Sequence, residues 1–264
     1  MQKQMNLPVL KLKQDVVTRW NSTYDMLNRV VSRKDAVIAT LALVRHELAL
    51  NTTEWQVVEE AIPILKSFYE VTTEISTEKQ VSLSKVIVYS RLLHQHISNC
   101  NLEVYSPEAQ KMITSLKAQI HRRFYDKSDV ESNVLYAEAT ILDPRFKNRG
   151  FRDVNKYERA VSGLKKKVGL SSRINVRTEN SESRSTAQPR PEAVGEPSNS
   201  SASIWQKFDE EVSALVPCNP VAAGIVELDK YIQESLLGRF ENPLIWWKER
   251  KPVYPILYSY ILKD

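Results

Sequence analysis

Asn242-Pro243-Leu244-Ile245-Trp246-Trp247-Lys248 and, a few residues later, Tyr254-Pro255-Ile256-Leu257 form an uncommon aromatic cluster near the C-terminus. An asparagine can accept hydrogen bonds from the free N–H groups of a first helical turn, and a proline after it already has a helical φ angle. Both segments therefore predict the start of a short helix. Adjacent helical residues point about 100° apart, so we expect one of Trp246 and Trp247 to pack inward and the other outward.

The rest of the chain also shows apolar residues at helical spacing. Thr53-Glu54-Trp55-Gln56 resembles a capping box and Ser106-Pro107 a second helix start. Pro63 lacks a backbone donor, so we expect it to bend or divide its helix. Only Val9–Lys13 alternates weakly, as a strand would. The predicted helices cover 20–31, 35–48, 53–75, 83–97, 107–124, 133–142, 155–168, 204–216 and 227–237.

A change of composition divides the chain into three parts. Helical patterns fill residues 1–170, whereas residues 171–203 are rich in Ser, Arg, Glu, Pro and Asn and contain no aromatic residue. Such a segment buries too little apolar surface to offset the entropy lost on ordering. We therefore predict a helical domain over 1–170, a disordered linker over 171–203 and a second helical region over 204–264.

The bulk composition excludes several classes of protein. The net charge of +5 permits contact with nucleic acid, but proteins that bind none have similar values. Cys100 and Cys218 show no pairing pattern, which favours a reducing compartment and excludes a disulfide framework. The N-terminus has no apolar signal sequence, and no run of 18 apolar residues occurs. We expect an intracellular protein with no membrane segment.

No residue pattern predicts catalysis, a metal site or a cofactor. His94 and His96 stand two apart, so on a helix they point to different faces, and no paired-cysteine spacing is present. Asp143 is followed by a proline, a pair that most often ends a helix, so we assign it a structural role. The adjacent acids Glu59-Glu60 also diverge on a helix. No glycine-rich phosphate loop or serine elbow is present.

Four blocks in order resemble the hAT (hobo/Ac/Tam3) superfamily of transposases and the BED zinc-finger proteins derived from them. The blocks are Gln14–Tyr24 (QDVVTRWNSTY), Ala139–Lys147 (ATILDPRFK), Glu227–Tyr231 (ELDKY) and the aromatic cluster at 242–257. The resemblance implies a mainly α fold. Its two parts would be the helical insertion domain of an RNase H-like transposase and a truncated C-terminal dimerisation segment.

The resemblance also implies roles for individual residues. In hAT transposases an Arg-Trp pair at the position of Arg19 and Trp20 handles a flipped base at the transposon end. The alternative is that Trp20 anchors its helix in the core and Arg19 is a surface charge. The dimerisation region implies self-association contacts, although Trp246 and Trp247 fit an intramolecular core equally well. The candidate dimerisation residues are Leu228, Tyr231, Pro243, Leu244, Trp246, Trp247, Tyr254 and Leu257.

The carboxylates that catalyse transposition in the family do not map onto this sequence. Two aspartates belong upstream of the Arg-Trp block, and a glutamate belongs to a Ser-Glu-Arg block beyond Lys263. We therefore expect a non-catalytic, nuclear interaction protein without a cofactor, which associates with itself or with other hAT-derived proteins and does not bind a membrane. Two alternatives remain open, namely a fragment of a DNA transposase and a helical DNA-binding module.

Overall fold

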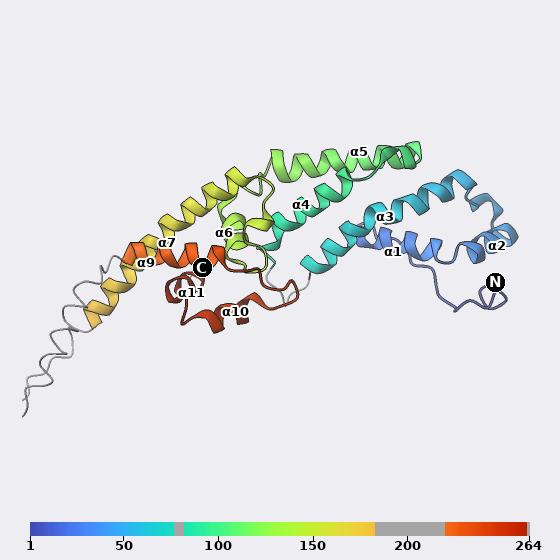
Figure 1. The fold of residues 1–264 in the computed structure, drawn as a ribbon. Coiled ribbons are helices and arrows are strands. Elements are labelled where there is room, and N and C mark those ends of the chain that lie inside the picture. Colours follow the sequence, from blue (N-terminus) through green and yellow to red (C-terminus); the bar gives the residue numbers. More distant parts are fainter. Residues whose placement is uncertain (77–81, 183–219, 263–264) are drawn as a thin grey trace, which may run out of the picture. The chain divides into compact units, whose positions relative to one another are not determined.

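The structure, a computed structural model, describes residues 1–76, 82–182 and 220–262, and all regular structure in these residues is helical (Figure 1). The predicted mainly α fold is confirmed. The weak strand prediction at Val9–Lys13 is wrong, because the Gln2 side-chain amide occupies both backbone hydrogen-bonding groups of Leu10, at 2.7 and 2.9 Å. Two compact units make up the chain: Met1–Thr140 with Arg149–Val154, and Ile141–Asn148 with Asn155–Asp264.

Unit 1 is an array of antiparallel and crossing helices in which α1 packs on α3, and α3, α4 and α5 pack on one another (Figure 1). Its helices are α1 (Trp20–Val31), α2 (Lys34–Val44), α3 (Thr52–Ile75), α4 (Lys85–Ser98) and α5 (Pro107–His121). Short turns of 3-10 helix lie at His46–Leu48 and Leu102–Val104, and α5 runs into a π-helical turn, η3 (Arg122–Asp126).

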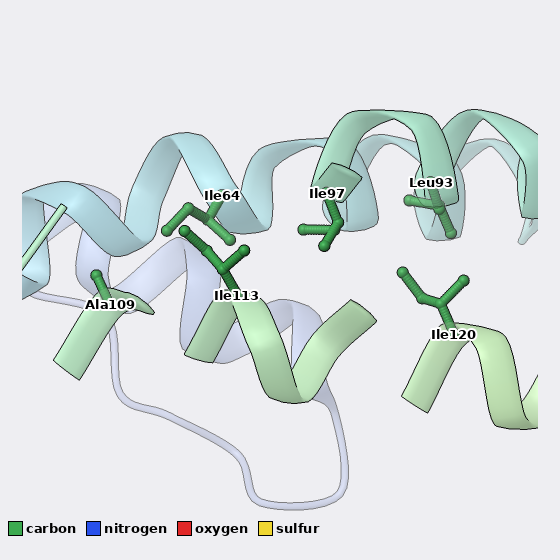
Figure 2. Packing of buried hydrophobic residues seen from close by; sticks show 6 residues of the cluster. All are labelled: Ile64, Leu93, Ile97, Ala109, Ile113 and Ile120. Atoms are coloured by element: carbon green, nitrogen blue, oxygen red, sulfur yellow. The ribbon is translucent and has the colours of Figure 1, made fainter. Parts of the chain in front are cut away.

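An aliphatic cluster lies in the core of unit 1. Side chains from α3, α4 and α5 point toward one another in Figure 2, with Ile64 opposite Ile113 and Leu93 opposite Ile120. Each is at most 6% exposed. Those of α4 recur at a spacing of four residues and those of α5 at spacings of four and seven, so each of these two helices contributes one apolar stripe. The cluster consists of Ile64, Leu93, Ile97, Ala109, Ile113 and Ile120.

Helix α3 begins earlier than predicted and is not divided. The capping box is formed by Asn51 and Glu54, not by Thr53 and Gln56: the Glu54 N–H donates to Asn51 Oδ1 at 2.9 Å, and the Asn51 N–H donates to Glu54 Oε2 at 2.8 Å. Asn51 has the extended backbone that a cap needs. Pro63 lies inside the continuous 24-residue helix, where it removes only one donor while neighbouring turns hold the helix to the core.

The N-terminus of α5 forms as predicted. Pro107 is the first helical residue, and the Ala109 N–H donates to Ser106 Oγ at 3.4 Å. Glu60 on α3 supports this cap, because its Oε2 accepts both the Ser106 N–H at 2.9 Å and the Ser106 hydroxyl at 2.6 Å. These bonds hold the carboxylate in its charged form and lower its pKa.

Unit 2 combines the segment Ile141–Asn148 with the C-terminal helices α7 (Val154–Glu182), α9 (Pro220–Gln233), α10 (Pro243–Arg250) and α11 (Pro255–Ile261). The chain passes between the units within α6 (Val134–Leu142) and within the turn η4 (Lys147–Gly150). Helices α7 and α9 approach closely at Gly169: an added Cβ would lie 2.8 Å from Val221 Cγ1, a distance that real Cβ atoms do not show.

The unit boundary differs from the predicted division at residue 170, because Ile141–Asn148 and α7 pack with the C-terminal helices. Residues 171–182 of the predicted linker continue α7. The remainder of the linker and the predicted helix 204–216 lie outside the described residues.

Candidate dimerisation site

Four aromatic rings pack together at the centre of unit 2. Tyr231 on α9 lies 4.9 Å from Trp247 on α10 and 6.1 Å from Tyr254, the residue that precedes α11, measured between ring centroids. Trp246 packs edge-on against Trp247 at 5.0 Å and parallel to Tyr254 at 6.4 Å. Tyr231, Trp247 and Tyr254 are buried, whereas Trp246 is partly exposed. The cluster thus fixes α9, α10 and the start of α11 together.

Buried tyrosine and tryptophan rings need partners for their polar atoms, and those of Tyr231 and Trp247 lie in the segment Ile141–Lys147. Three backbone carbonyls of that segment, those of Ile141, Leu142 and Pro144, accept hydrogen bonds from the C-terminal helices and the loop after α9. The donors are, in this order, the Tyr231 hydroxyl at 3.0 Å, the Trp247 indole N–H at 2.9 Å and the Leu237 backbone N–H at 2.9 Å. The aromatic cluster therefore binds a distant segment of its own chain.

The carboxylate of Asp143 in that segment forms an ion pair with Arg145, two residues later in the chain. Arg145 donates to both Asp143 carboxylate oxygens, from Nε at 2.9 Å and from Nη2 at 2.6 Å, and its backbone N–H adds a third bond at 3.0 Å. Both side chains are buried. Such a bidentate pair fixes geometry as well as charge. The contacts of Asp143 support the structural role that the sequence predicts.

Lys147 closes the end of α9. Its Nζ donates to the carbonyls of Tyr231 at 2.6 Å and Glu234 at 2.8 Å, and it lies 4.4 Å from the centroid of the Tyr231 ring. A cation at a helix C-terminus satisfies carbonyls that have no helical partner. The side chain is only 1% exposed, and this burial lowers the pKa of Lys147 to about 8, although Glu234 opposes the shift.

Two glutamates of α9 and the loop after it hold α10 and α11. Glu227 Oε2 accepts the N–H groups of Ile256 at 3.0 Å and Leu257 at 3.1 Å, so it caps the first turn of α11. Burial raises the pKa of the Glu227 carboxyl, and these two bonds oppose the shift. Glu234 Oε1 accepts the Tyr254 hydroxyl at 2.7 Å. Burial, followed by this bond to Glu234, raises the pKa of Tyr254.

The eight candidate dimerisation residues divide into two groups. Six are buried within unit 2: Leu228, Tyr231, Pro243, Trp247, Tyr254 and Leu257. The other two lie at the surface of α10, where Leu244 is 58% exposed and Trp246 partly exposed. Ile245, which the sequence did not single out, is 55% exposed beside them. Of the tryptophan pair, Trp247 is therefore the core residue.

The two DNA-contact candidates stand at the start of α1, in unit 1. Arg19 is exposed, and the side chain of Trp20 lies outside the described residues. Two hydrogen bonds connect α1 to the segment before it: the hydroxyls of Ser22 and Thr23 donate to Asp15 Oδ1 at 2.6 and 3.0 Å. These bonds, that from Ser22 first, lower the pKa of Asp15.

Within residues 1–76, 82–182 and 220–262, no three or more His, Cys, Asp or Glu side chains are arranged to hold a metal ion. His94 and His96 contact different elements: His96 Nε2 lies 3.3 Å from the Ile64 carbonyl oxygen, and His94 Nε2 lies 3.5 Å from Arg152 Nη1. No helix in the described ranges is both long and apolar enough to cross a membrane.

Comparison with known proteins agrees with this architecture. Residues 1–63 match the ZBED1 RNase-like helical domain, and residues 227–263 match the hAT family C-terminal dimerisation region. The human zinc finger BED domain-containing protein 4 is 26% identical over 97% of this chain, and the putative AC transposase of Zea mays is 27% identical over 92%. The zinc finger BED domain-containing protein RICESLEEPER 1 of Oryza sativa subsp. japonica is 25% identical over 96%.

The chain is thus similar to hAT transposases and to BED zinc-finger proteins, the two groups that its four sequence blocks resemble. It spans 20% of the length of the human relative, 30% of the maize relative and 36% of the rice relative.

Sequence reasoning missed the importance of Lys147 and of the backbone carbonyls around it. The Ala139–Lys147 block resembles the family by its side chains. Hydrogen bonds accepted by main-chain carbonyls do not depend on side-chain identity, so the sequence does not indicate them. One signal was available: three large aromatic residues with polar atoms, Tyr231, Trp247 and Tyr254, require partners when buried. A lysine at the end of a motif suggests a solvated charge, and only the fold reveals that it caps α9.

Proposed function

We propose that this chain is a non-catalytic, transposase-derived interaction module of the nucleus that associates through the outer face of α10 with a second copy or another hAT-derived protein. The main observation behind this proposal is that Leu244 and Ile245, adjacent residues of α10, are 58% and 55% exposed, while the opposite face of the helix is buried in unit 2. They lie within residues 227–263, the match to the hAT dimerisation region.

The rigidity of α10 supports this proposal. Pro243 and Trp247 are buried beneath the helix, and the Asn242 side chain caps its first turn by accepting the Leu244 N–H at 2.9 Å. Because the backbone of α10 is already fixed, binding through its exposed side chains costs little further backbone entropy. Trp246 at the edge of the same face adds an aromatic ring of the kind found at interface hot spots.

The non-catalytic part of the proposal rests on the carboxylates. Transposition in the family needs three acids that converge on two divalent cations, and the described ranges contain no such acidic group. Asp143, the acid of the Ala139–Lys147 block, is engaged by Arg145. Nuclear location is proposed from the kinds of protein that match, BED zinc-finger proteins and transposases. Because the chain covers only part of each relative, their activities are not assigned to it.

A second proposal is DNA contact through Arg19 and Trp20. The observation that favours it is that Arg19 is exposed at the start of a 12-residue helix. The hydrogen bonds from Ser22 and Thr23 to Asp15 hold the chain beside it. A guanidinium there can neutralise a phosphate, and an indole beside it can stack on a base, a contact worth about 1–3 kcal/mol.

Sedimentation velocity over a concentration series tests the self-association. We expect the wild-type sedimentation coefficient to rise with concentration, and the double variant Leu244→Ser, Ile245→Ser to remain monomeric. The matched control is Val226→Ser with Leu170→Ser, which removes two exposed apolar side chains from α9 and α7. Circular dichroism checks that all variants keep their helix content. A wild-type chain that stays monomeric at tens of micromolar contradicts the proposal, as does equal weakening by both double variants.

An assay of strand cleavage and transfer tests the non-catalytic role. Purified chain is incubated with Mg²⁺ or Mn²⁺ and with nicked or hairpin duplex DNA. We expect no reaction above the buffer control. Cleavage that co-purifies with the chain and disappears on Asp143→Asn or another acid substitution contradicts the proposal.

A further inference from the structure

Three segments of unit 1 meet at the ring of Tyr125, which lies in the π-turn η3. His94 on α4 contacts this ring edge-on, with the two ring centroids 5.6 Å apart. The guanidinium of Arg152 lies 4.7 Å from the centroid of the same ring, and Arg152 Nη1 lies 3.5 Å from His94 Nε2. Each of the three side chains therefore contacts the other two.

The backbone at Arg152 is held independently of its side chain. The buried carboxylate of Glu131 accepts the backbone N–H of Arg152 at 2.8 Å and that of Asp153 at 3.2 Å, so both of its oxygens bind main chain. Arg152 itself is an exposed residue. Its side chain can therefore turn into solvent while its backbone stays in place.

The contact between Arg152 and His94 requires an unprotonated imidazole nitrogen. A guanidinium keeps its charge in proteins and has only donors, so His94 Nε2 accepts from it only while that nitrogen carries no proton. A protonated imidazole has two donors and no acceptor. Its Nε2 would then lie 3.5 Å from a second cationic donor. Protonation of His94 therefore turns this contact from attraction into repulsion.

The charged groups around His94 oppose its protonation. Burial lowers the pKa of the His94 imidazole first, and the cations Arg152, Lys117 and His121 lower it further. The carboxylate of Asp126 lies 3.0 Å from His121 Nδ1, where it compensates a proton on His121. Since the pKa of His94 lies below its ordinary value of 6.5, the imidazole is neutral at neutral pH and takes up a proton only in acid solution.

We propose that His94, Tyr125 and Arg152 form a latch that a proton opens: while His94 is neutral, the Arg152 side chain lies over the Tyr125 ring, and when His94 is protonated, that side chain turns into solvent and uncovers the ring. This device is separate from the outer face of α10, from Arg19 and from Trp20.

The balance of interactions favours opening in acid solution. A guanidinium at an exposed site gains little from one aromatic ring, whereas two cations in contact repel each other strongly where burial reduces screening. Turning Arg152 into solvent removes this repulsion at the cost of the ring contact alone, because Glu131 still holds the backbone. The Tyr125 hydroxyl keeps its proton throughout, because burial raises its pKa. His94 is therefore the residue of this trio that titrates between neutral and acid pH.

NMR spectroscopy of the full chain, isotope-labelled at histidine Cε1 and arginine Cδ, tests the proposal in a titration from about pH 8 to about pH 5. Single substitutions assign the signals. At neutral pH the Tyr125 ring should shift the Arg152 Cδ protons upfield, and this shift should disappear with the midpoint of the His94 titration. In His94→Gln, which does not titrate, the shift should be independent of pH. The matched control is His46→Gln, which replaces an exposed histidine of unit 1 and should leave the Arg152 titration unchanged.

A second variant tests the coupling from the other side. Arg152→Gln removes the cation, so the midpoint of the His94 titration should rise, whereas Lys127→Gln, which removes an exposed cation two residues after Tyr125, should leave it unchanged. Circular dichroism shows that each variant is folded. An unchanged His94 midpoint in Arg152→Gln overturns the proposal.

Three further outcomes also overturn it. The Arg152 shift could persist while His94 titrates, it could follow the midpoint of His121, or it could still depend on pH in His94→Gln. Hydrogen exchange separates a latch from local unfolding. The backbone amides of Arg152 and Asp153 should stay protected at both ends of the titration, because Glu131 holds them, and loss of that protection in acid would mean that the whole segment opens.

Discussion

The two units of this chain bury their helices with different kinds of side chain. In unit 1, the side chains that α3, α4 and α5 pack against one another in Figure 2 are aliphatic. In unit 2, the aromatic core also forms hydrogen bonds: Tyr231 and Trp247 donate to main-chain carbonyls of the segment Ile141–Lys147, and Tyr254 donates to Glu234. An aliphatic core specifies volume, whereas an aromatic core with hydrogen bonds also specifies which segment must lie where.

Because of this difference, truncation of a buried side chain should lower stability for different reasons in the two units. Truncation in unit 1 leaves a cavity, and its cost depends on how far the neighbours can close in. Truncation in unit 2 leaves, in addition, a buried carbonyl without a donor, which costs about 1–3 kcal/mol more. The buried aromatic residues therefore stabilise the platform from which α10 presents Leu244 and Ile245.

The largest effect is expected from Trp247→Ala. It removes an indole that is 3% exposed and leaves the Leu142 carbonyl without its donor, so we expect a loss of about 3–5 kcal/mol. Because two units need not unfold together, hydrogen exchange read by mass spectrometry is the measurement. Exchange should increase in α9, α10 and α11. Equal loss of protection in the Ile64–Ile113 core would contradict the comparison, and Trp247→Phe, which keeps a ring, should lie between wild type and Trp247→Ala.

Ile113→Ala tests the aliphatic side of the comparison. Ile113 is 2% exposed at the centre of the unit 1 cluster, so its truncation should cost about 2–5 kcal/mol. The loss of protection should fall on α3, α4 and α5. Ile113→Val, which removes a single methylene, should cost only about 0.5–1.5 kcal/mol. Such a graded loss of stability is expected where the cost depends on the volume removed from the core. An equally large loss in the valine variant would contradict this dependence on volume.

A smaller, purely polar effect is expected from Tyr231→Phe. The substitution keeps the ring contacts with Trp247 and Tyr254 and deletes only the hydroxyl that donates to the Ile141 carbonyl at 3.0 Å. An unsatisfied buried acceptor should cost about 1–3 kcal/mol. Urea denaturation followed by circular dichroism measures it. The control is Tyr258→Phe, at a partly exposed position of α11, and a neutral Tyr231→Phe would show that the hydrogen bond adds nothing to ring packing.

Much of this fold follows from the sequence, since apolar spacing locates the helices and Ser106-Pro107 and Asn242-Pro243 locate helix starts that the structure has. The Asn51 cap was missed because Thr53 and Gln56 fit the same pattern two residues later, and local sequence alone does not choose between two registers of one motif.

The candidate site was less predictable. A list of apolar residues at the C-terminus does not separate Tyr231 and Leu257, which are buried, from Leu244, which is exposed. That separation depends on which segment covers them, and the covering segment Ile141–Lys147 is about ninety residues away in sequence. Long-range pairing of this kind is fixed by tertiary packing and not by local pattern.

The smallest effect concerns pH and Lys147. In the folded chain burial lowers the pKa of this lysine to about 8 from 10.5. Below pH 8 both the folded and unfolded states carry the proton, so stability does not change with pH. Between pH 8 and 10.5 the unfolded state binds more protons, and the free energy of unfolding therefore rises with pH. Tyr231 and Tyr254, whose pKa values are raised, oppose this only above about pH 10.

We therefore expect the free energy of unfolding to rise by about 1 kcal/mol between roughly pH 7.5 and pH 9, measured by urea denaturation at constant ionic strength. Lys147→Met should remove this rise because a thioether does not titrate. The same variant should also lower stability at pH 9, since the carbonyls of Tyr231 and Glu234 lose their donor. Lys166→Met, an exposed lysine of α7, is the control and should keep the rise. If Lys147→Met retains the wild-type pH dependence, the buried cation is not its source, and the polar core of unit 2 does not respond to pH through this residue.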